Sequence, residues 1–167
     1  MRHVISILIE NEAGALSRVV GLFSQRGYNI DSLTVAPTDD ETLSRCTILT
    51  SGDKSEAEQI TKQLHKLVNV IKVSSQQDDS CGIVEREILF VKVQAVGHTQ
   101  REEIKTLCDI FKAEIVDITP ELYILQFVNT SFEVDRFLKA VAEQAEVVET
   151  VRSGVCGIFR GEHSLHS

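Results

Sequence analysis

Asn11 and Gly14 lie between an apolar run and an amphipathic segment, and this setting suits the binding of an anion. The first backbone N–H groups of a helix have no partner within the helix, and they face outward at the positive end of its dipole. A carboxylate binds there readily, and a glycine keeps its approach open. The amide of Asn11 adds an oxygen for an ammonium group and an N–H for a carboxylate. These residues therefore suit a free amino acid, although the same residue types also shape ordinary turns.

Apolar periodicity predicts the elements that position this turn. Residues 4–9 alternate as in a strand, and apolar residues at helical spacing follow from Ala15 until Gly27, which suits a left-handed helix end. A second helix is predicted after Asp53, which forms a capping-box pattern with the glutamate three residues later. Further strands are predicted at 28–36, 43–50 and 70–73. The order is βαββαβ.

The same order returns after a polar stretch, which predicts a linker over residues 75–83. Helices are predicted to begin at caps formed by Thr99 and Thr130. Strands are predicted at 87–95, 113–119, 122–128 and 146–151. The fold class is therefore α+β, with two ferredoxin-like sandwiches in tandem, in domains 1–74 and 84–167. Because such units are small, we expect their uncovered sheet faces or edges to be buried between domains or subunits.

Composition excludes several classes of protein. The chain has 167 residues, 43% of them hydrophobic, and no apolar run that is long enough to cross a membrane. Its net charge of −8 argues against a nucleic-acid partner. No signal or transit peptide is expected, because residues 1–3 lead directly into a strand. Widely spaced cysteines, with Cys46 and Cys108 inside predicted elements, favour buried thiols, no metal site and a reduced cytoplasm.

The sequence contains no recognisable catalytic constellation. It has no phosphate-binding glycine loop, no zinc-protease motif and no nucleophile elbow. His65 is expected at a helix rim, and His163 and His166 fall in a polar tail where solvation is expected. We therefore expect no catalytic residue and no cofactor bound by this chain.

Several motifs resemble those of the small regulatory subunit of bacterial acetohydroxyacid synthase, also called acetolactate synthase. The resemblance spans nearly the whole chain and is more specific in its first half. It is carried by residues 11–18, 21–30, 32–38, 43–45, 62–67, 85–87 and 152–154.

The resemblance implies an ACT domain, an amino-acid-sensing form of the ferredoxin-like fold, followed by an ACT-like domain. Two ACT domains would join edge to edge in a homodimer and bind a branched-chain amino acid, usually valine, at their interface. One subunit would contribute Asn11, Gly14 and Ala15, and its partner Asn29 and Ile30. Many ACT domains have aspartate where this chain has Asn11, which makes the ammonium contact less charge-assisted.

The resemblance also implies that the chemistry belongs to a catalytic large subunit, which uses thiamine diphosphate, Mg²⁺ and FAD. This chain would activate that partner and confer feedback inhibition by valine in branched-chain amino acid biosynthesis. Two other classes compete with this interpretation: an enzyme in its own right, and a free-standing amino-acid sensor that regulates another partner. Gel filtration with the large subunit would separate them.

Overall fold

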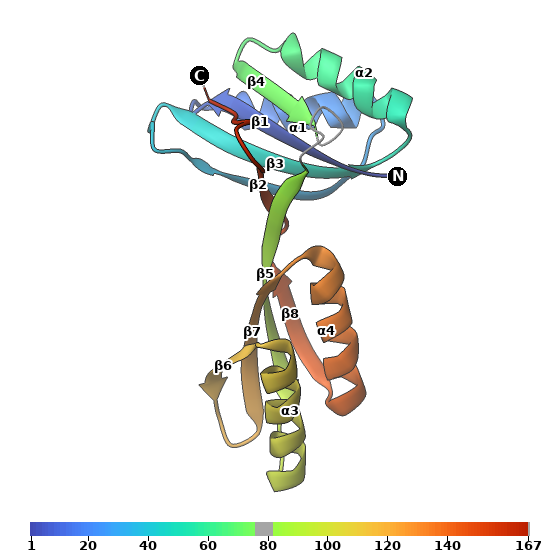
Figure 1. Cartoon of the computed structure of the whole chain (residues 1–167), viewed down its shortest axis with the longest axis vertical. Coiled ribbons are helices and arrows are strands. Elements are labelled where there is room, and N and C mark those ends of the chain that lie inside the picture. The colour runs from blue at the N-terminus through green and yellow to red at the C-terminus, as the bar shows by residue number, and fades with distance from the viewer. Residues whose placement is uncertain (76–81, 167) are drawn as a thin grey trace. The chain divides into compact units, whose positions relative to one another are not determined.

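The first half of the chain forms an antiparallel four-stranded sheet with two helices on one face, as Figure 1 shows in blue to green. The computed structural model describes residues 1–75 and 82–166. The strands lie in the order β2-β3-β1-β4, which is the ferredoxin-like arrangement that the sequence predicts. The elements are β1 (Arg2–Glu10), α1 (Ala15–Gln25), β2 (Ile30–Pro37), β3 (Leu43–Ser51), α2 (Lys54–His65) and β4 (Val70–Ser75).

Alternation in β1 decides which face of this sheet packs on the helices. Ile5, Ile7 and Ile9 are buried against a cluster that includes Val19 and Phe23 of α1. The helix ends as predicted, since Gly27 has a φ of 71°. The predicted capping box of α2 is confirmed as well: Asp53 accepts from the N–H of Glu56, and the carboxylate of Glu56 accepts from the N–H of Asp53.

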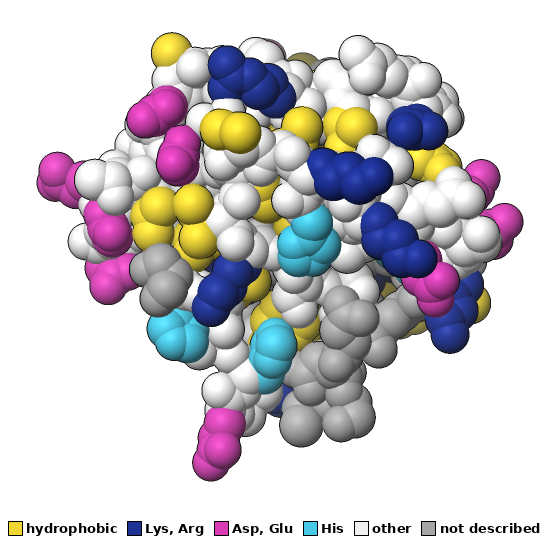
Figure 2. Space-filling model, turned by 90° about the horizontal axis from the view of Figure 1, so that it is seen from above, with side chains coloured by type: hydrophobic (Ala, Val, Ile, Leu, Met, Phe, Trp, Pro, Cys, Tyr) yellow, Lys and Arg dark blue, Asp and Glu magenta, His cyan; other side chains and the backbone are white. Residues whose placement is uncertain are grey.

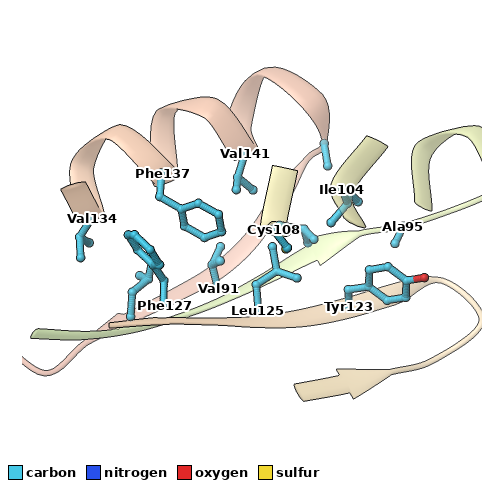
Figure 3. Packing of buried hydrophobic residues seen from close by; sticks show 13 residues of the cluster. Val91, Ala95, Ile104, Cys108, Tyr123, Leu125, Phe127, Val134, Phe137 and Val141 are labelled. Carbon is cyan, nitrogen blue, oxygen red and sulfur yellow. The ribbon is translucent and has the colours of Figure 1, made fainter. Parts of the chain in front are cut away.

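The second half repeats this architecture, with strand order β6-β7-β5-β8. In its core, Phe127 of β7 and Phe137 of α4 have ring centroids 4.7 Å apart, and Phe111 of α3 lies 5.3 Å from Phe137. Figure 3 shows these helices presenting apolar side chains to the sheet around Val91 and Leu125. The elements are β5 (Ile83–Gln94), α3 (His98–Phe111), β6 (Glu114–Ile118), β7 (Leu122–Asn129), α4 (Ser131–Gln144) and β8 (Val147–Arg152).

One of the two helix caps predicted in this half is wrong. Thr130 caps α4, accepting from the N–H of Glu133 at 3.4 Å, as expected. Helix α3 instead begins after Gly97, which has a φ of 80° and replaces Thr99 as the N-cap. Gly97 adopts a backbone conformation that threonine avoids, so the helix begins earlier than the side-chain pattern indicates.

The C-terminal segment from Val155 onward packs on the first unit. Thr34 of β2 donates a hydrogen bond to the carbonyl of Val155 at 2.9 Å, and Arg45 of β3 donates to Gly157 at 3.2 Å. Strand β9 (Cys156–Phe159) pairs with β5. The side chains of Val155 and Phe159 are only 1% and 5% exposed. This segment therefore covers the sheet face opposite the helices, a face that we expected to be buried between domains or subunits.

This contact changes the division of the chain. Residues 1–85 and the segment from Val155 onward form one compact unit, and 86–154 form the other. The expected second domain, 84–167, therefore extends too far. Its residues from Val155 onward belong to the first unit, in which Val155 and Phe159 bury their side chains. Most of the expected linker, residues 76–81, lies outside the described residues.

An ion pair with one buried partner connects three elements of the second unit. Glu87 of β5 has only 3% of its side chain exposed and accepts a hydrogen bond from Nε of Arg152 at 2.5 Å. Arg152 of β8 also contacts Asp135 of α4 at 2.7 Å, and Ser131 donates to Glu87 at 3.0 Å. Burial lowers the pKa of the Arg152 guanidinium, but the two carboxylates raise it by more, so this guanidinium stays charged.

Replacing Phe159 by alanine is expected to destabilise the first unit by about 3 kcal/mol, because it removes a buried ring that packs on the sheet. Hydrogen exchange of the β1 amides would report the loss. Ile158→Ala is the matched control, since Ile158 neighbours Phe159 and is 61% exposed. Equal exchange in the two variants would show that the C-terminal segment contributes nothing to the stability of the sheet.

Candidate functional site

The turn between β1 and α1 exposes unpaired backbone donors. Gly14 is the N-cap of α1, with a φ of 87° and no side-chain cap. The N–H of Ala15 donates to Glu12 at 3.2 Å. In the described ranges, the N–H groups of Leu16 and Ser17 have no hydrogen-bond acceptor. Two donors at the positive end of the α1 dipole are therefore available to an anion, as the sequence predicts.

Asn11 already donates two hydrogen bonds within the chain. Its Nδ2 donates to the carbonyl of Glu41 at 2.9 Å, and its backbone N–H donates to Thr42 at 2.8 Å. These contacts fix the side chain, and the amide oxygen has no partner among the described residues. Asn11 can thus accept from an ammonium group, and its NH₂ carries a second hydrogen, besides the one donated to Glu41, for a carboxylate.

Arg18 adds a positive charge that the sequence analysis missed. Its guanidinium lies beside the turn, since a Cβ built at Gly14 would be 3.8 Å from Nη2 of Arg18. A hydrogen bond to Asn69 fixes this position. Asn69 is 5% exposed and donates in turn to Glu10 at 2.9 Å. Arg18 follows Gly14 by one helical turn, and that spacing was the signal that could have identified it.

The other predicted residues lie beyond the far end of α1. Asn29 is exposed, its Nδ2 donates to Asp31 at 2.7 Å, and its carbonyl accepts from Thr50 at 2.6 Å. Ile30 begins β2 and packs against the core. Gly14 and Asn29 flank the 11 residues of α1, which span about 16 Å at 1.5 Å per residue. One chain therefore does not bring the two halves of the predicted site together.

Strand β2 is an edge of its sheet. The last three residues of this strand, Val35, Ala36 and Pro37, are exposed, and Val35 is 41% exposed. An edge strand presents unpaired N–H and C=O groups, which another chain can pair with. Because Ile30 begins this edge, a second copy pairing here would place Asn29 and Ile30 at a subunit interface.

Two of the thiols are structural. Burial raises the pKa of Cys46 to about 12, and burial together with the charge of Asp109 raises the pKa of Cys108 to about 11. Both cysteines are buried, as the sequence predicts. Neither provides a thiolate at neutral pH, so neither is suited to nucleophilic chemistry.

The described residues contain neither a cluster of metal-ligating side chains nor a helix that could span a membrane. No three His, Cys, Asp or Glu side chains in these ranges are grouped to hold a metal ion. Among the helices described, none has the length and apolar character needed to cross a membrane.

The fold is that of two ACT-like units in tandem, and comparisons with known proteins identify the family. Residues 5–72 match the ACT domain of acetohydroxyacid synthase small subunits, and residues 86–161 match the second domain of the acetolactate synthase small subunit. The chain belongs to the acetolactate synthase small subunit family.

Relatives from several organisms match over nearly their whole length. The chain is 56% identical to the acetolactate synthase isozyme 3 small subunit of Escherichia coli, covering 97% of this chain and 98% of that protein. It is 54% identical to the Haemophilus influenzae small subunit, with 99% of each chain covered. The crystal structure of the Thermotoga maritima small subunit superposes with a TM-score of 0.85 at 34% identity, over 98% of this chain and 99% of that one. The tandem fold is thus confirmed.

Proposed function

We propose that this chain is the regulatory subunit of acetolactate synthase and makes a catalytic large subunit responsive to valine in the cytoplasm. The observation that carries the proposal is the open turn at Gly14, where unpaired N–H groups and Arg18 meet in a chain of the small-subunit family. The reaction itself, with thiamine diphosphate, Mg²⁺ and FAD, belongs to the large subunit. Regulation then requires valine to bind one state of the complex more tightly than another, with a coupling of about 1–3 kcal/mol.

The turn supplies complementary groups for both charged ends of valine. The N–H groups of Leu16 and Ser17 and the guanidinium of Arg18 suit the carboxylate. The free amide oxygen of Asn11 suits the ammonium group. Buried Ala15 and, from a second copy, Ile30 and Asn29 would complete the pocket.

The dimer is expected to be the form that binds valine. Strand β2 offers an edge for pairing, and pairing across it would bring Asn29 of one copy toward Gly14 of the other. Light scattering at micromolar concentration with valine present should give twice the chain mass. A monomer that still binds valine would refute the shared site.

The regulatory role is tested by measuring acetolactate formation. The purified chain with thiamine diphosphate, Mg²⁺ and FAD is expected to form none, whereas its addition to the large subunit should raise activity and make it valine-sensitive. Acetolactate formed by the chain alone would overturn the proposal. A chain that binds valine but does not change the activity of the large subunit would instead be a free-standing amino-acid sensor that regulates another partner.

A further inference from the structure

We propose a second ligand site in the first unit, a basic hollow that takes a small molecule carrying phosphate groups. The hollow has a volume of about 690 Å³, within the range of about 300–1,000 Å³ that is typical of small-molecule sites. It lies between the end of α1 and one side of α2. Its lining residues are Arg26, Tyr28, Gln59, Lys62, Gln63, His65 and Lys66.

Helical spacing brings the α2 residues of this hollow onto one side. Gln59, Lys62, Gln63 and Lys66 are separated by three, one and three positions, so they form a single stripe. This stripe differs from the buried side of α2, which carries Ala57, Ile60 and Leu64. Arg26 is the C-cap of α1 and enters from the other helix. Each of these cations also complements the dipole at the C-terminal end of its own helix, and the two helix ends bring them to the same hollow.

The hollow is positive although the chain is negative. Arg26, Lys62 and Lys66 give the lining three positive charges, and no carboxylate lines it, in a chain of net charge −8. In residues 1–75 and 82–166, none of these three cations forms an ion pair. Seen from above, where α2 lies uppermost in Figure 1, Figure 2 shows Lys, Arg and His side chains in the middle of this face and acidic ones mostly toward its margins.

The polar groups of the lining complement an anion with many acceptor oxygens. Tyr28 donates its hydroxyl hydrogen to Oε1 of Gln59 at 3.2 Å, which leaves the amide NH₂ of Gln59 as a donor. The lysines, the arginine and this amide are donors, and a phosphate ester or pyrophosphate supplies acceptors with more than one negative charge. The hollow is open to solvent, and its concave shape suits a small molecule better than a flat acidic protein surface. The site is separate from the Gly14 turn, because Arg26 and Gly14 flank opposite ends of α1.

Titration calorimetry of inorganic pyrophosphate into the full chain at low salt tests this site. We expect one bound pyrophosphate per chain, and Lys62→Gln with Lys66→Gln should weaken its affinity at least about tenfold. The matched control is Lys105→Gln with Lys139→Gln, which removes the same charge from exposed positions on α3 and α4 and should change the affinity less than about twofold.

Three outcomes would overturn the proposal. The first is no binding to the native chain, and the second is an equal loss in both double variants, which would indicate diffuse attraction alone. The third is displacement of pyrophosphate by saturating valine, which would place it at the Gly14 turn. If pyrophosphate does not bind but the Lys62 and Lys66 variant loses the large subunit, the hollow docks an acidic protein surface instead. The pyrophosphate titration does not involve the large subunit or its response to valine. A failure of the proposed regulatory function would therefore appear in the activity assay and not in this titration.

Discussion

Gly14→Asp is expected to give a folded subunit that activates the large subunit but no longer transmits inhibition by valine. The new carboxylate would occupy the space in front of the Leu16 and Ser17 N–H groups and lie close to the guanidinium of Arg18. It would compete with the carboxylate of valine for these groups at a cost of about 2–4 kcal/mol, or roughly 30- to 1,000-fold in affinity. Calorimetry with valine, beside an activity assay of the complex, measures both effects.

The fold should tolerate this substitution. A side chain at this φ is strained by about 1–3 kcal/mol, but aspartate adopts positive φ more readily than most residues. An acid near a helix N-terminus offsets part of this strain by about 0.3–1 kcal/mol. Gly14→Asn is the matched control, because it places a side chain of the same shape at the same φ of 87° without the negative charge. Unchanged valine affinity in the Gly14→Asp variant would show that this turn only connects a strand to a helix.

Arg152→Leu is expected to destabilise the second unit by about 1–3 kcal/mol. The substitution leaves the carboxylate of Glu87 buried, and within the described ranges the hydroxyl of Ser131 is then its remaining side-chain hydrogen-bond partner. Removing one partner of a buried ion pair has a large cost because the remaining charge has no compensation. Hydrogen exchange of the β5 and β7 amides reports the loss within this unit.

A double variant distinguishes the cost of the unpaired charge from the cost of lost packing. Adding Glu87→Leu to Arg152→Leu removes the stranded charge and should recover much of the stability. Lys92→Gln breaks the exposed pair with Glu149, whose atoms are 3.8 Å apart, and should cost less than about 1 kcal/mol. If Arg152→Leu costs no more than Lys92→Gln, the Glu87 pair is not a stabilising contact.

Local features of the sequence determined the order of the elements and the position of the turn. Alternation in β1 and helical spacing after Ala15 predicted the βαββαβ order, since these periods arise from backbone geometry. The cap at Asp53 and the left-handed Gly27 were predicted from contacts within a few residues. The cap predicted at Thr99 was wrong, because Gly97 could adopt a conformation that the side-chain pattern does not show.

Tertiary structure alone decided the contacts between distant segments. Arg18 gains its place at the candidate site from Asn69, which is 51 positions away. Glu87 and Arg152 pair across 65 positions, and the segment from Val155 onward packs on strands of the first unit. Periodicity reports which face of an element is apolar, but many distant segments could cover such a face. Only the packed chain, in which burial and hydrogen bonds must be satisfied together, selects the segment that does so.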